Sequence, residues 1–331
     1  MMQAIRFPEL DQIEVAEVSE PSAGAGEVVV RLKAAALNRR DLWIKQGQYA
    51  GLKFPLIPGS DGAGEIAAMG AGVEGVSPGD EVIINPSFDW GTDERAQAKS
   101  FSILGLPRDG TLAERIAVPA AQLAPKPAHL SWNEAAALPL AGLTAYRALF
   151  ARAGLKAGEK VLISGVGGGV ASFALQFAVA AGAQVWVTSS SADKIAEAVE
   201  LGAEAGFDYR ADGWAKAVAA ELGGFDVVVD SAGGDGFGRL IDLCNPGARV
   251  VFFGATRGDP PVLPMRKVFW KQISLLGTTM GSPLDWHAMM AFVSQHGIRP
   301  VVSATFPLAD AAAAFELMAA GEQSGKIVIT I

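Results

Sequence analysis

The sequence predicts an α/β protein that combines a doubly wound, six-stranded parallel sheet with a β-rich domain. Three observations predict this fold class. Apolar strands and helices alternate regularly over residues 123–281, and a glycine turn joins one of these strands to the helix after it. Residues 1–122 are rich in strand patterns and turn residues but poor in helical periodicity.

The β-rich part is assigned to residues 1–122. Residues 27–34 (Glu-Val-Val-Val-Arg-Leu-Lys-Ala) alternate as a strand does, and residues 79–84 form a turn that leads into another strand. Residues 123–127 (Leu-Ala-Pro-Lys-Pro) break this pattern, and Ser131 with Glu134 then forms the capping box of a helix. We therefore expect a domain boundary near Leu123 and a dinucleotide-binding domain over residues 123–281.

The most informative stretch is the glycine turn at residues 165–169. A short apolar strand precedes it, and a helix over residues 170–181 follows it, with Gly182 as the left-handed end. Glycines let the backbone approach a pyrophosphate, and the helix N-terminus favours its negative charge. A tight turn without a ligand is the alternative, but the strand at residues 183–188 completes a strand-helix-strand unit of suitable length. The predicted cofactor-binding residues here are Gly165, Gly167, Gly168, Gly169 and Val170.

The end of the next strand favours NADPH over NADH. NAD-binding domains usually carry an Asp or Glu there, whereas this chain has Thr-Ser-Ser-Ser at residues 188–191, followed by Lys194. Hydroxyl donors with one cation suit a 2′-phosphate, so Ser189, Ser190 and Lys194 are predicted to bind the cofactor. Ser191 is equally expected to cap a helix, and Asp193 is an acid that argues against a phosphate.

Six strands are predicted for the parallel sheet, the number of a complete dinucleotide-binding fold. They cover residues 161–164, 184–188, 205–208, 226–230, 249–253 and 273–277. An amphipathic helix over residues 308–320 and a strand over residues 326–331 are expected to return to the first domain, so that residues 282–331 complete it. A cleft between the two domains is the expected place for a ligand.

Composition argues against several other classes of protein. The 331 residues carry a net charge of −8, and their basic residues are scattered, so we expect no nucleic-acid partner. No apolar run is long enough to span a membrane, the N-terminus lacks the core of a secretion signal, and there is one cysteine; together these predict a cytoplasmic protein.

The cysteine and histidines do not predict a metal site. One Cys and three His that lie far apart match no common zinc spacing. Cys244 is interpreted as a small buried filler, and His129, His287 and His296 as surface or packing residues.

Four further segments accompany the glycine turn: residues 36–41 (Ala-Leu-Asn-Arg-Arg-Asp), 58–64 (Pro-Gly-Ser-Asp-Gly-Ala-Gly), 138–146 (Leu-Pro-Leu-Ala-Gly-Leu-Thr-Ala-Tyr) and 325–328 (Gly-Lys-Ile-Val). In this order the parts resemble the medium-chain dehydrogenase/reductase superfamily, and within it the zinc-free quinone oxidoreductase-like branch. The resemblance covers essentially the whole chain. It implies a Rossmann domain and a GroES-like catalytic domain.

The resemblance also implies that the enzyme works without zinc. Zinc-dependent members have a cysteine where this chain has Asn38, a Gly-His-Glu where it has Gly59-Ser60-Asp61, and a four-cysteine lobe where residues 93–106 hold no cysteine. Without a Lewis acid to polarise an alcohol or carbonyl oxygen, hydride transfer to a quinone or an α,β-unsaturated carbonyl is favoured.

The substrate-side residues that the resemblance implies are Asn38, Asp41, Trp43 and Tyr49. We expect Asn38 to orient the substrate. Related reductases tend to have tyrosine at the position of Trp43, whose indole can stack on a flat ring but cannot donate a proton as a phenol does. Tyr49 is the better candidate proton donor, with simple lining of the pocket as the alternative.

The resemblance places a second group of residues on the cofactor side. Thr144 matches a position near the nicotinamide, and Ser189, Lys194 and Tyr209 match positions near the adenosine phosphate, although the Tyr209 ring has ordinary packing as an equal alternative. The backbone at the end of the fifth strand is expected to face the nicotinamide ribose. The remaining predicted cofactor-binding residues are Gly254, Ala255, Thr256 and Lys326.

The predicted function is an NADPH-dependent reductase of a small quinone or α,β-unsaturated carbonyl. One alternative is an NADPH-binding sensor or structural protein with little turnover, and another is a zinc-free alcohol or aldehyde dehydrogenase-like oxidoreductase. An S-adenosylmethionine methyltransferase shares the strand, loop and helix but does not explain the β-rich first third. The resemblance further implies a homodimer joined through the nucleotide domains by the strands at residues 249–253 and 273–277.

Overall fold

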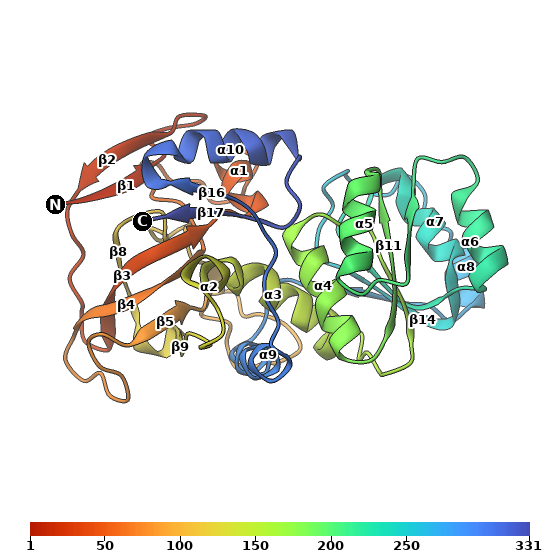
Figure 1. Cartoon of the computed structure of the whole chain (residues 1–331), viewed down its shortest axis with the longest axis horizontal. Coiled ribbons are helices and arrows are strands. Elements are labelled where there is room, and N and C mark those ends of the chain that lie inside the picture. The colour runs from red at the N-terminus through yellow and green to blue at the C-terminus, as the bar shows by residue number, and fades with distance from the viewer. The chain divides into compact units, whose positions relative to one another are not determined.

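The computed structural model describes residues 1–331, which form two compact units (Figure 1). Unit 1 consists of Met1–Leu143 and Gly281–Ile331, and unit 2 of Thr144–Met280. Residues 123–143, which we expected in the dinucleotide domain, therefore belong to unit 1. The reason is packing, because α2 (Trp132–Ala137) lies against strands β3, β4 and β17 of that unit. We expected the chain to return to the first domain at residue 282, and in the structure it returns at Gly281.

Unit 1 is built around a seven-stranded sheet with the order β16-β17-β3-β4-β5-β9, in which β8 also pairs with β3. These strands are β3 (Glu27–Ala36), β4 (Asp61–Met69), β5 (Glu81–Ile84), β8 (Arg115–Pro119), β9 (Leu123–Pro125), β16 (Val302–Pro307) and β17 (Lys326–Thr330). Two small sheets are formed by β1 (Met2–Arg6) with β2 (Glu14–Val18) and by β6 (Ser87–Phe88) with β7 (Ser102–Ile103). The register sets Ala36 opposite Asp61 on one side and opposite Val328 on the other. The sheet thus gathers segments that are far apart in the sequence.

One of the helices of unit 1 covers an apolar core. These helices are α1 (Arg39–Lys45), α2, α9 (Pro283–His296) and α10 (Ala311–Ala320), and α3 (Pro139–Tyr146) begins in this unit. The predicted C-terminal helix is confirmed as α10 after the 3-10 turn Leu308–Asp310, and Figure 1 shows it beside α1. Its residues Ala314, Phe315 and Met318 pack in one cluster with Phe7 and Ile329. Ala311–Ala320 therefore closes the core of this sheet.

Unit 2 is the predicted doubly wound fold. Its sheet has the order β12-β11-β10-β13-β14-β15, and all neighbours are parallel. The strands are β10 (Lys160–Ile163), β11 (Gln184–Ser189), β12 (Ala205–Asp208), β13 (Phe225–Asp230), β14 (Cys244–Phe252) and β15 (Ser274–Gly277). The helices are α4 (Gly169–Ala180), α5 (Ala192–Glu200), α6 (Trp214–Leu222), α7 (Phe237–Asp242) and α8 (Met265–Trp270). The whole chain also has three 3-10 turns, Ala120–Gln122, Gly234–Gly236 and Leu308–Asp310, and one π-helix, Arg147–Arg152.

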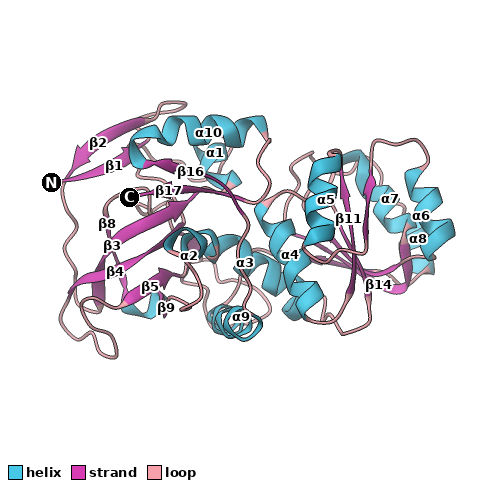
Figure 2. Cartoon of the chain, viewed as in Figure 1, coloured by secondary structure: helices cyan, strands magenta, loops and turns pink.

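Helices cover both faces of this sheet (Figure 2). Trp186 packs in one cluster with residues of α6, α7 and α8, whereas its neighbour Val187 lies with Ile195 of α5 against Gly206 on the other face. Burial on both faces explains why these strands read as continuous apolar runs. None of the helices has the length and apolar character needed to cross a bilayer.

Cys244 is buried at the start of β14, where its thiol donates a hydrogen bond to the Leu240 carbonyl oxygen at 3.2 Å. Burial raises the pKa of this thiol to about 12. Since the thiolate is the reactive form, we expect Cys244 in the folded protein to resist iodoacetamide at pH 8 and to react once the protein is unfolded in urea. Mass spectrometry of both samples checks this, and rapid labelling of the folded protein would contradict it.

Candidate functional site

The predicted glycine turn lies between β10 and α4, and there is open space next to Gly165 and Gly168. Gly165 and Gly167 have positive φ angles of 66° and 111°, which only glycine adopts without strain in such a turn. A Cβ atom on Gly165 or Gly168 would meet no heavy atom within 4 Å. The backbone N–H groups of Gly165 and Val166 are fixed by the side-chain and main-chain oxygens of Thr188, at 3.2 and 2.9 Å. The turn is therefore held at the carboxyl end of the sheet, with space above it.

The hydroxyl-rich end of β11 lies beside this turn. The methylene groups of Lys194 cover Gly167, whose added Cβ would lie 2.6 Å from Lys194 Cδ. Ser191 caps α5 by accepting the Lys194 N–H, as expected, and Ser189 Oγ accepts the Ser191 N–H at 3.2 Å. The Tyr209 N–H donates to the Ser189 carbonyl oxygen at 3.3 Å. The structure thus brings together the glycine turn and the predicted Ser189, Ser190, Lys194 and Tyr209.

Two residues that were not predicted from the sequence also lie at this carboxyl edge of the sheet. Asp230, at the end of β13, is buried; its carboxylate accepts hydrogen bonds from the Ser164 hydroxyl and, at 2.9 Å, from the Gly233 N–H. Arg210 donates to the carbonyl oxygen of Ser190 and pairs with Asp208. Asp230 ties the ends of β10 and β13 together, and Arg210 adds a second cation beside the serines. An acidic residue at the end of a predicted apolar strand is the signal that could have identified Asp230.

The other predicted residues of unit 2 lie at two further places. Gly254, Ala255 and Thr256 follow β14, and the Thr256 N–H donates to the Ser231 carbonyl oxygen at 3.2 Å. Thr144 is buried at the start of unit 2, where its hydroxyl lies 3.9 Å from the Met280 sulfur. The residues after β14 share the carboxyl edge of the sheet with the glycine turn.

Unit 1 holds a buried polar cluster that joins Asn38, Asp61 and Lys326. The Lys326 ammonium donates to the Asn38 amide oxygen at 2.7 Å and to the Asp61 carboxylate at 2.8 Å, and the Asn38 amide donates to Asp61 at 2.9 Å. The second Asp61 oxygen accepts the Leu140 N–H at 2.8 Å. Lys326 is only 4% exposed and Asp61 is fully buried. Lys326 was predicted to bind the cofactor; these contacts are all within unit 1, and cofactor binding by Lys326 stays a prediction.

Arg40 and Asp41 lie beside this cluster at the start of α1. Arg40 donates to the Ser60 hydroxyl and the Leu104 carbonyl oxygen, at 2.7 and 2.8 Å, and its guanidinium lies 5.0 Å from the centre of the Tyr49 ring. Two other guanidinium nitrogens and one Asp41 oxygen are buried without a hydrogen-bond partner. Trp43 is half-buried on the same short helix. Asn38, Asp41, Trp43 and Tyr49 are therefore brought together around α1.

Burial raises the pKa of the Asp41 carboxyl from 3.8 to about 6, against the opposing effect of Arg40. The folded state therefore holds this proton more tightly than the unfolded state, and Asp41 lowers stability as the pH rises from about 4 to about 6. Asp41→Asn removes this titration but keeps an oxygen for the Asn38 N–H, which Asp41 accepts at 2.8 Å. Measured by urea unfolding, the free energy of unfolding of the variant should rise by up to about 3 kcal/mol relative to that of the wild type as the pH increases across that window. A difference between the two proteins that stays constant from pH 4 to 7 would contradict this.

Family models match most of both units. The model described as "Alcohol dehydrogenase GroES-like domain" matches residues 24–128, and the model described as "Zinc-binding dehydrogenase" matches residues 169–295. The zinc-type alcohol dehydrogenase-like protein YogA of Leptosphaeria maculans is 37% identical over 95% of this chain and 93% of its own length. The chain belongs to the medium-chain dehydrogenase/reductase superfamily. It is thus an oxidoreductase, and its two-part fold is the one that this superfamily predicts.

The names of other similar proteins state different substrates and cofactors. The acryloyl-coenzyme A reductase of Metallosphaera sedula is 32% identical over 96% of each chain. The crystal structure of an NAD-dependent alcohol dehydrogenase matches with a TM-score of 0.94 and 39% identity over the whole of both chains. The crotonyl-CoA carboxylase/reductase AntE V350A in complex with NADP matches with a TM-score of 0.89 and 25% identity over 100% of this chain and 95% of its own.

The residues of this chain do not fit the zinc ion of zinc-dependent members. At the positions where the family resemblance implies zinc ligands, this chain has Asn38, Ser60 and Asp61, and their polar atoms are engaged by the Lys326 ammonium and the Arg40 guanidinium. A dication there would lie against two fixed positive charges. No group of three or more His, Cys, Asp or Glu side chains is arranged to hold a metal. The zinc-binding dehydrogenase model covers residues 169–295 and contains none of these three positions.

The residues of unit 2 do fit a dinucleotide. The open space above Gly165 and Gly168 leaves room for a pyrophosphate against backbone N–H groups at the start of α4. Ser189, Ser190 and Lys194 would hold the adenosine side, and the backbone of Gly254, Ala255 and Thr256 would hold the nicotinamide side.

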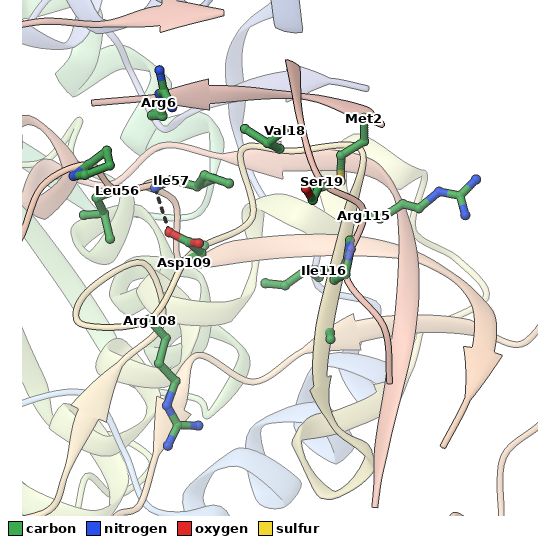
Figure 3. Close-up of a pocket in the computed structure, with 14 residues that line it drawn as sticks. Met2, Arg6, Val18, Ser19, Leu56, Ile57, Arg108, Asp109, Arg115 and Ile116 are labelled. Atoms are coloured by element: carbon green, nitrogen blue, oxygen red, sulfur yellow. Dashed lines mark hydrogen bonds between the residues drawn. The ribbon is translucent and has the colours of Figure 1, made fainter. Parts of the chain in front are cut away.

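A cavity of about 520 Å³ in unit 1 contains none of the predicted site residues. Figure 3 shows its apolar wall of Val18, Ile57 and Ile116, with Asp109 turned toward the Ile57 N–H, which it accepts at 2.9 Å. Its three arginines, Arg6, Arg108 and Arg115, are paired with Glu14, Asp89 and Glu20. This cavity therefore carries no arrangement suited to catalysis.

Proposed function

We propose that this oxidoreductase is a zinc-independent, NADPH-dependent reductase of quinones or α,β-unsaturated carbonyl compounds. The observation that carries the proposal is the Lys326 ammonium held between Asn38 and Asp61, two positions at which the family resemblance implies metal ligands in zinc-dependent members. Without a metal to polarise an alcohol oxygen, an acceptor that is already electrophilic at carbon is the more suitable substrate. The named acryloyl-CoA and crotonyl-CoA reductases act on compounds of this kind, which supports including enoyl thioesters among the candidate substrates.

When bound, the nicotinamide would supply the hydride. The residues around α1 would handle the substrate: the Trp43 indole offers a flat face for stacking, the Asn38 amide orients a carbonyl oxygen, and the Tyr49 hydroxyl is the candidate proton donor. The Arg40 guanidinium against the Tyr49 ring keeps a positive charge next to that phenol. Tyr49→Phe tests the proton donor, because it removes only the hydroxyl.

The choice of NADPH rests on the side chains beside Gly167. Ser189, Ser190 and Lys194 supply hydroxyl groups and a cation, Arg210 supplies a second cation, and the strand end lacks the carboxylate that holds a ribose 2′-hydroxyl. The matching alcohol dehydrogenase is described as NAD-dependent, so the preference has to be measured on this chain.

The test is calorimetric titration of the wild type and Lys194→Ala with NADPH and NADH in parallel, followed by turnover assays with quinones, enones and enoyl thioesters. We expect the wild type to prefer NADPH and Lys194→Ala to weaken NADPH binding about tenfold or more, as the loss of a charge-assisted contact predicts, with little change for NADH. Equal binding of both cofactors would refute the phosphate site. Tight binding without turnover would favour a sensor or structural protein, and zinc-stimulated alcohol oxidation would refute the zinc-independent reading.

We also propose that the protein is a homodimer joined through unit 2. Strand β15 is at the edge of the sheet, and Val262, Met265, Phe269 and Trp270 expose 57–82% of their surface just before it. An open edge strand beside exposed apolar side chains is a common pairing surface. Light scattering after size-exclusion chromatography should give a dimer, and Trp270→Glu with Phe269→Glu should give a monomer. A wild-type monomer at micromolar concentration would rule the dimer out.

A further inference from the structure

The loop after β14 carries an exposed arginine whose backbone is held in place. The Arg257 N–H donates to the Ala232 carbonyl oxygen at 2.8 Å, and the Gly234 N–H donates to the Gly258 carbonyl oxygen at 2.7 Å. Gly233 and Gly234 lie so close to this loop that an added Cβ would be 2.5 Å from the Gly258 oxygen or 2.8 Å from the Arg257 oxygen. Two segments thus fix the Arg257 backbone against the turn after β13, while its side chain extends into solvent.

The Arg257 side chain extends along the carboxyl edge of the parallel sheet to the end of β12. Its guanidinium lies 5.9 Å from the centre of the Tyr209 ring, and Tyr209 follows β12. In the sheet order, β10 and β11 lie between β12 and β13. The contact between Arg257 and Tyr209 therefore spans the carboxyl ends of β10 and β11, which is where the glycine turn and the serines lie.

The position of Tyr209 decides which part of a dinucleotide Arg257 can reach. The Tyr209 N–H is bonded to Ser189, and the neighbouring Arg210 is bonded to Ser190. The guanidinium of Arg257 thus lies against a residue whose backbone and whose neighbour are bonded to the serines; it comes from the loop after β14, whereas Lys194 comes from α5. A guanidinium on an aromatic face is held weakly, and a phosphate is a stronger partner for it.

Resting on the proposed NADPH dependence, we propose that Arg257 is a cofactor-specificity residue that closes over the dinucleotide groove and binds the 2′-phosphate of NADPH. In the free protein, Tyr209 holds the guanidinium over the groove. On binding, the guanidinium stays against the aromatic ring and also contacts the phosphate, so that the 2′-phosphate is contacted by Arg257 from the loop after β14 and by Lys194 from α5. No covalent change is involved.

The experiment is titration calorimetry of Arg257→Gln with four ligands: NADPH, NADH, 2′,5′-ADP and 5′-AMP. We expect the affinity for NADPH and 2′,5′-ADP to fall about tenfold or more, as for a lost charge-assisted contact, and the affinity for NADH and 5′-AMP to stay within about twofold. Arg266→Gln, an exposed arginine of α8, is the matched control for the loss of one positive charge and should leave all four affinities unchanged.

Tyr209→Leu tests the holding role of the ring. It should weaken NADPH binding in the wild-type background but have little further effect in the Arg257→Gln background, because the two side chains act together. Equal losses for NADPH and NADH would overturn the proposal, since Arg257 would then contact the pyrophosphate or adenine. Unchanged NADPH affinity in Arg257→Gln would overturn it as well. If the wild type binds no cofactor or has no NADPH preference, the proposed NADPH dependence itself fails, which is a distinguishable result.

Discussion

Lys326→Met should destabilise the protein by about 3–5 kcal/mol, the usual cost of removing one partner from a buried ion pair. The substitution keeps most of the side-chain volume but leaves the fully buried Asp61 carboxylate without its ammonium partner. It also removes the donor from the Asn38 amide oxygen, which is 2.7 Å away. Urea unfolding monitored by circular dichroism measures the loss, and a change below about 1 kcal/mol would contradict the assigned contacts.

Two further variants separate this effect from a general loss of a lysine. Lys267→Met breaks an ion pair with Asp242 in which both side chains are about half exposed, so it should cost less than about 1 kcal/mol. Adding Asp61→Asn to Lys326→Met removes the unpaired charge and should recover part of the stability. If the double variant is as unstable as Lys326→Met, the Lys326 effect comes from packing and not from the charge of Asp61.

The buried cluster also shows why this part of the site was only partly predicted. Asn38 and the Gly59-Ser60-Asp61 segment stood out as departures from a zinc-ligand pattern, and this could be read along the sequence. Their partner Lys326 is far away in the chain, and it arrives only because β17 and β4 pair with opposite sides of β3. Sequence spacing contains no information on such a register, so the contacts of Lys326 with Asn38 and Asp61 could not be predicted.

Local signals predicted the elements of unit 2 well. The six strands, the helix after the glycine turn and its end at Gly182 each depend on short apolar runs or on glycine conformations. The capping box at Ser131 and Glu134 was also correct. The domain boundary near Leu123 was not, because α2 looks like the start of an alternating domain but packs on the sheet of unit 1. Capping chemistry locates where a helix begins and leaves open which sheet it covers.

Two helices of unit 1, α1 and α9, are not among the elements predicted from the sequence. In α1, Arg40 and Asp41 are buried charges, so the segment lacks the apolar face by which helices are found. In α9, the Ser282 and Asp285 capping box, Pro283 and the terminal Gly297 are all helix signals, although this helix is not among the predicted elements. The contact between Arg257 and Tyr209 joins the ends of β14 and β12, and only the folded sheet makes it visible.

Gly167→Ala should weaken NADPH binding about tenfold or more and NADH binding much less, because the added methyl group displaces Lys194. The new Cβ would lie 2.6 Å from Lys194 Cδ, and the flexible lysine side chain is the group that moves. The backbone at residue 167 has a φ of 111°, so the variant should also lose about 1–2 kcal/mol of stability. Titration calorimetry and urea unfolding measure the two effects separately.

Gly158→Ala is the matched control for strain. Gly158 also has a positive φ, 81°, in the turn before β10, but its added Cβ would meet no heavy atom within 4 Å. We expect a comparable loss of stability in this variant with unchanged affinity for both cofactors. Because NADPH and NADH share the pyrophosphate, a loss of NADPH affinity in Gly167→Ala that exceeds both its own loss of NADH affinity and the loss in Gly158→Ala reports the contact of residue 167 with Lys194. If Gly167→Ala loses no more NADPH affinity than Gly158→Ala, Lys194 does not act on the cofactor from its place over the glycine turn.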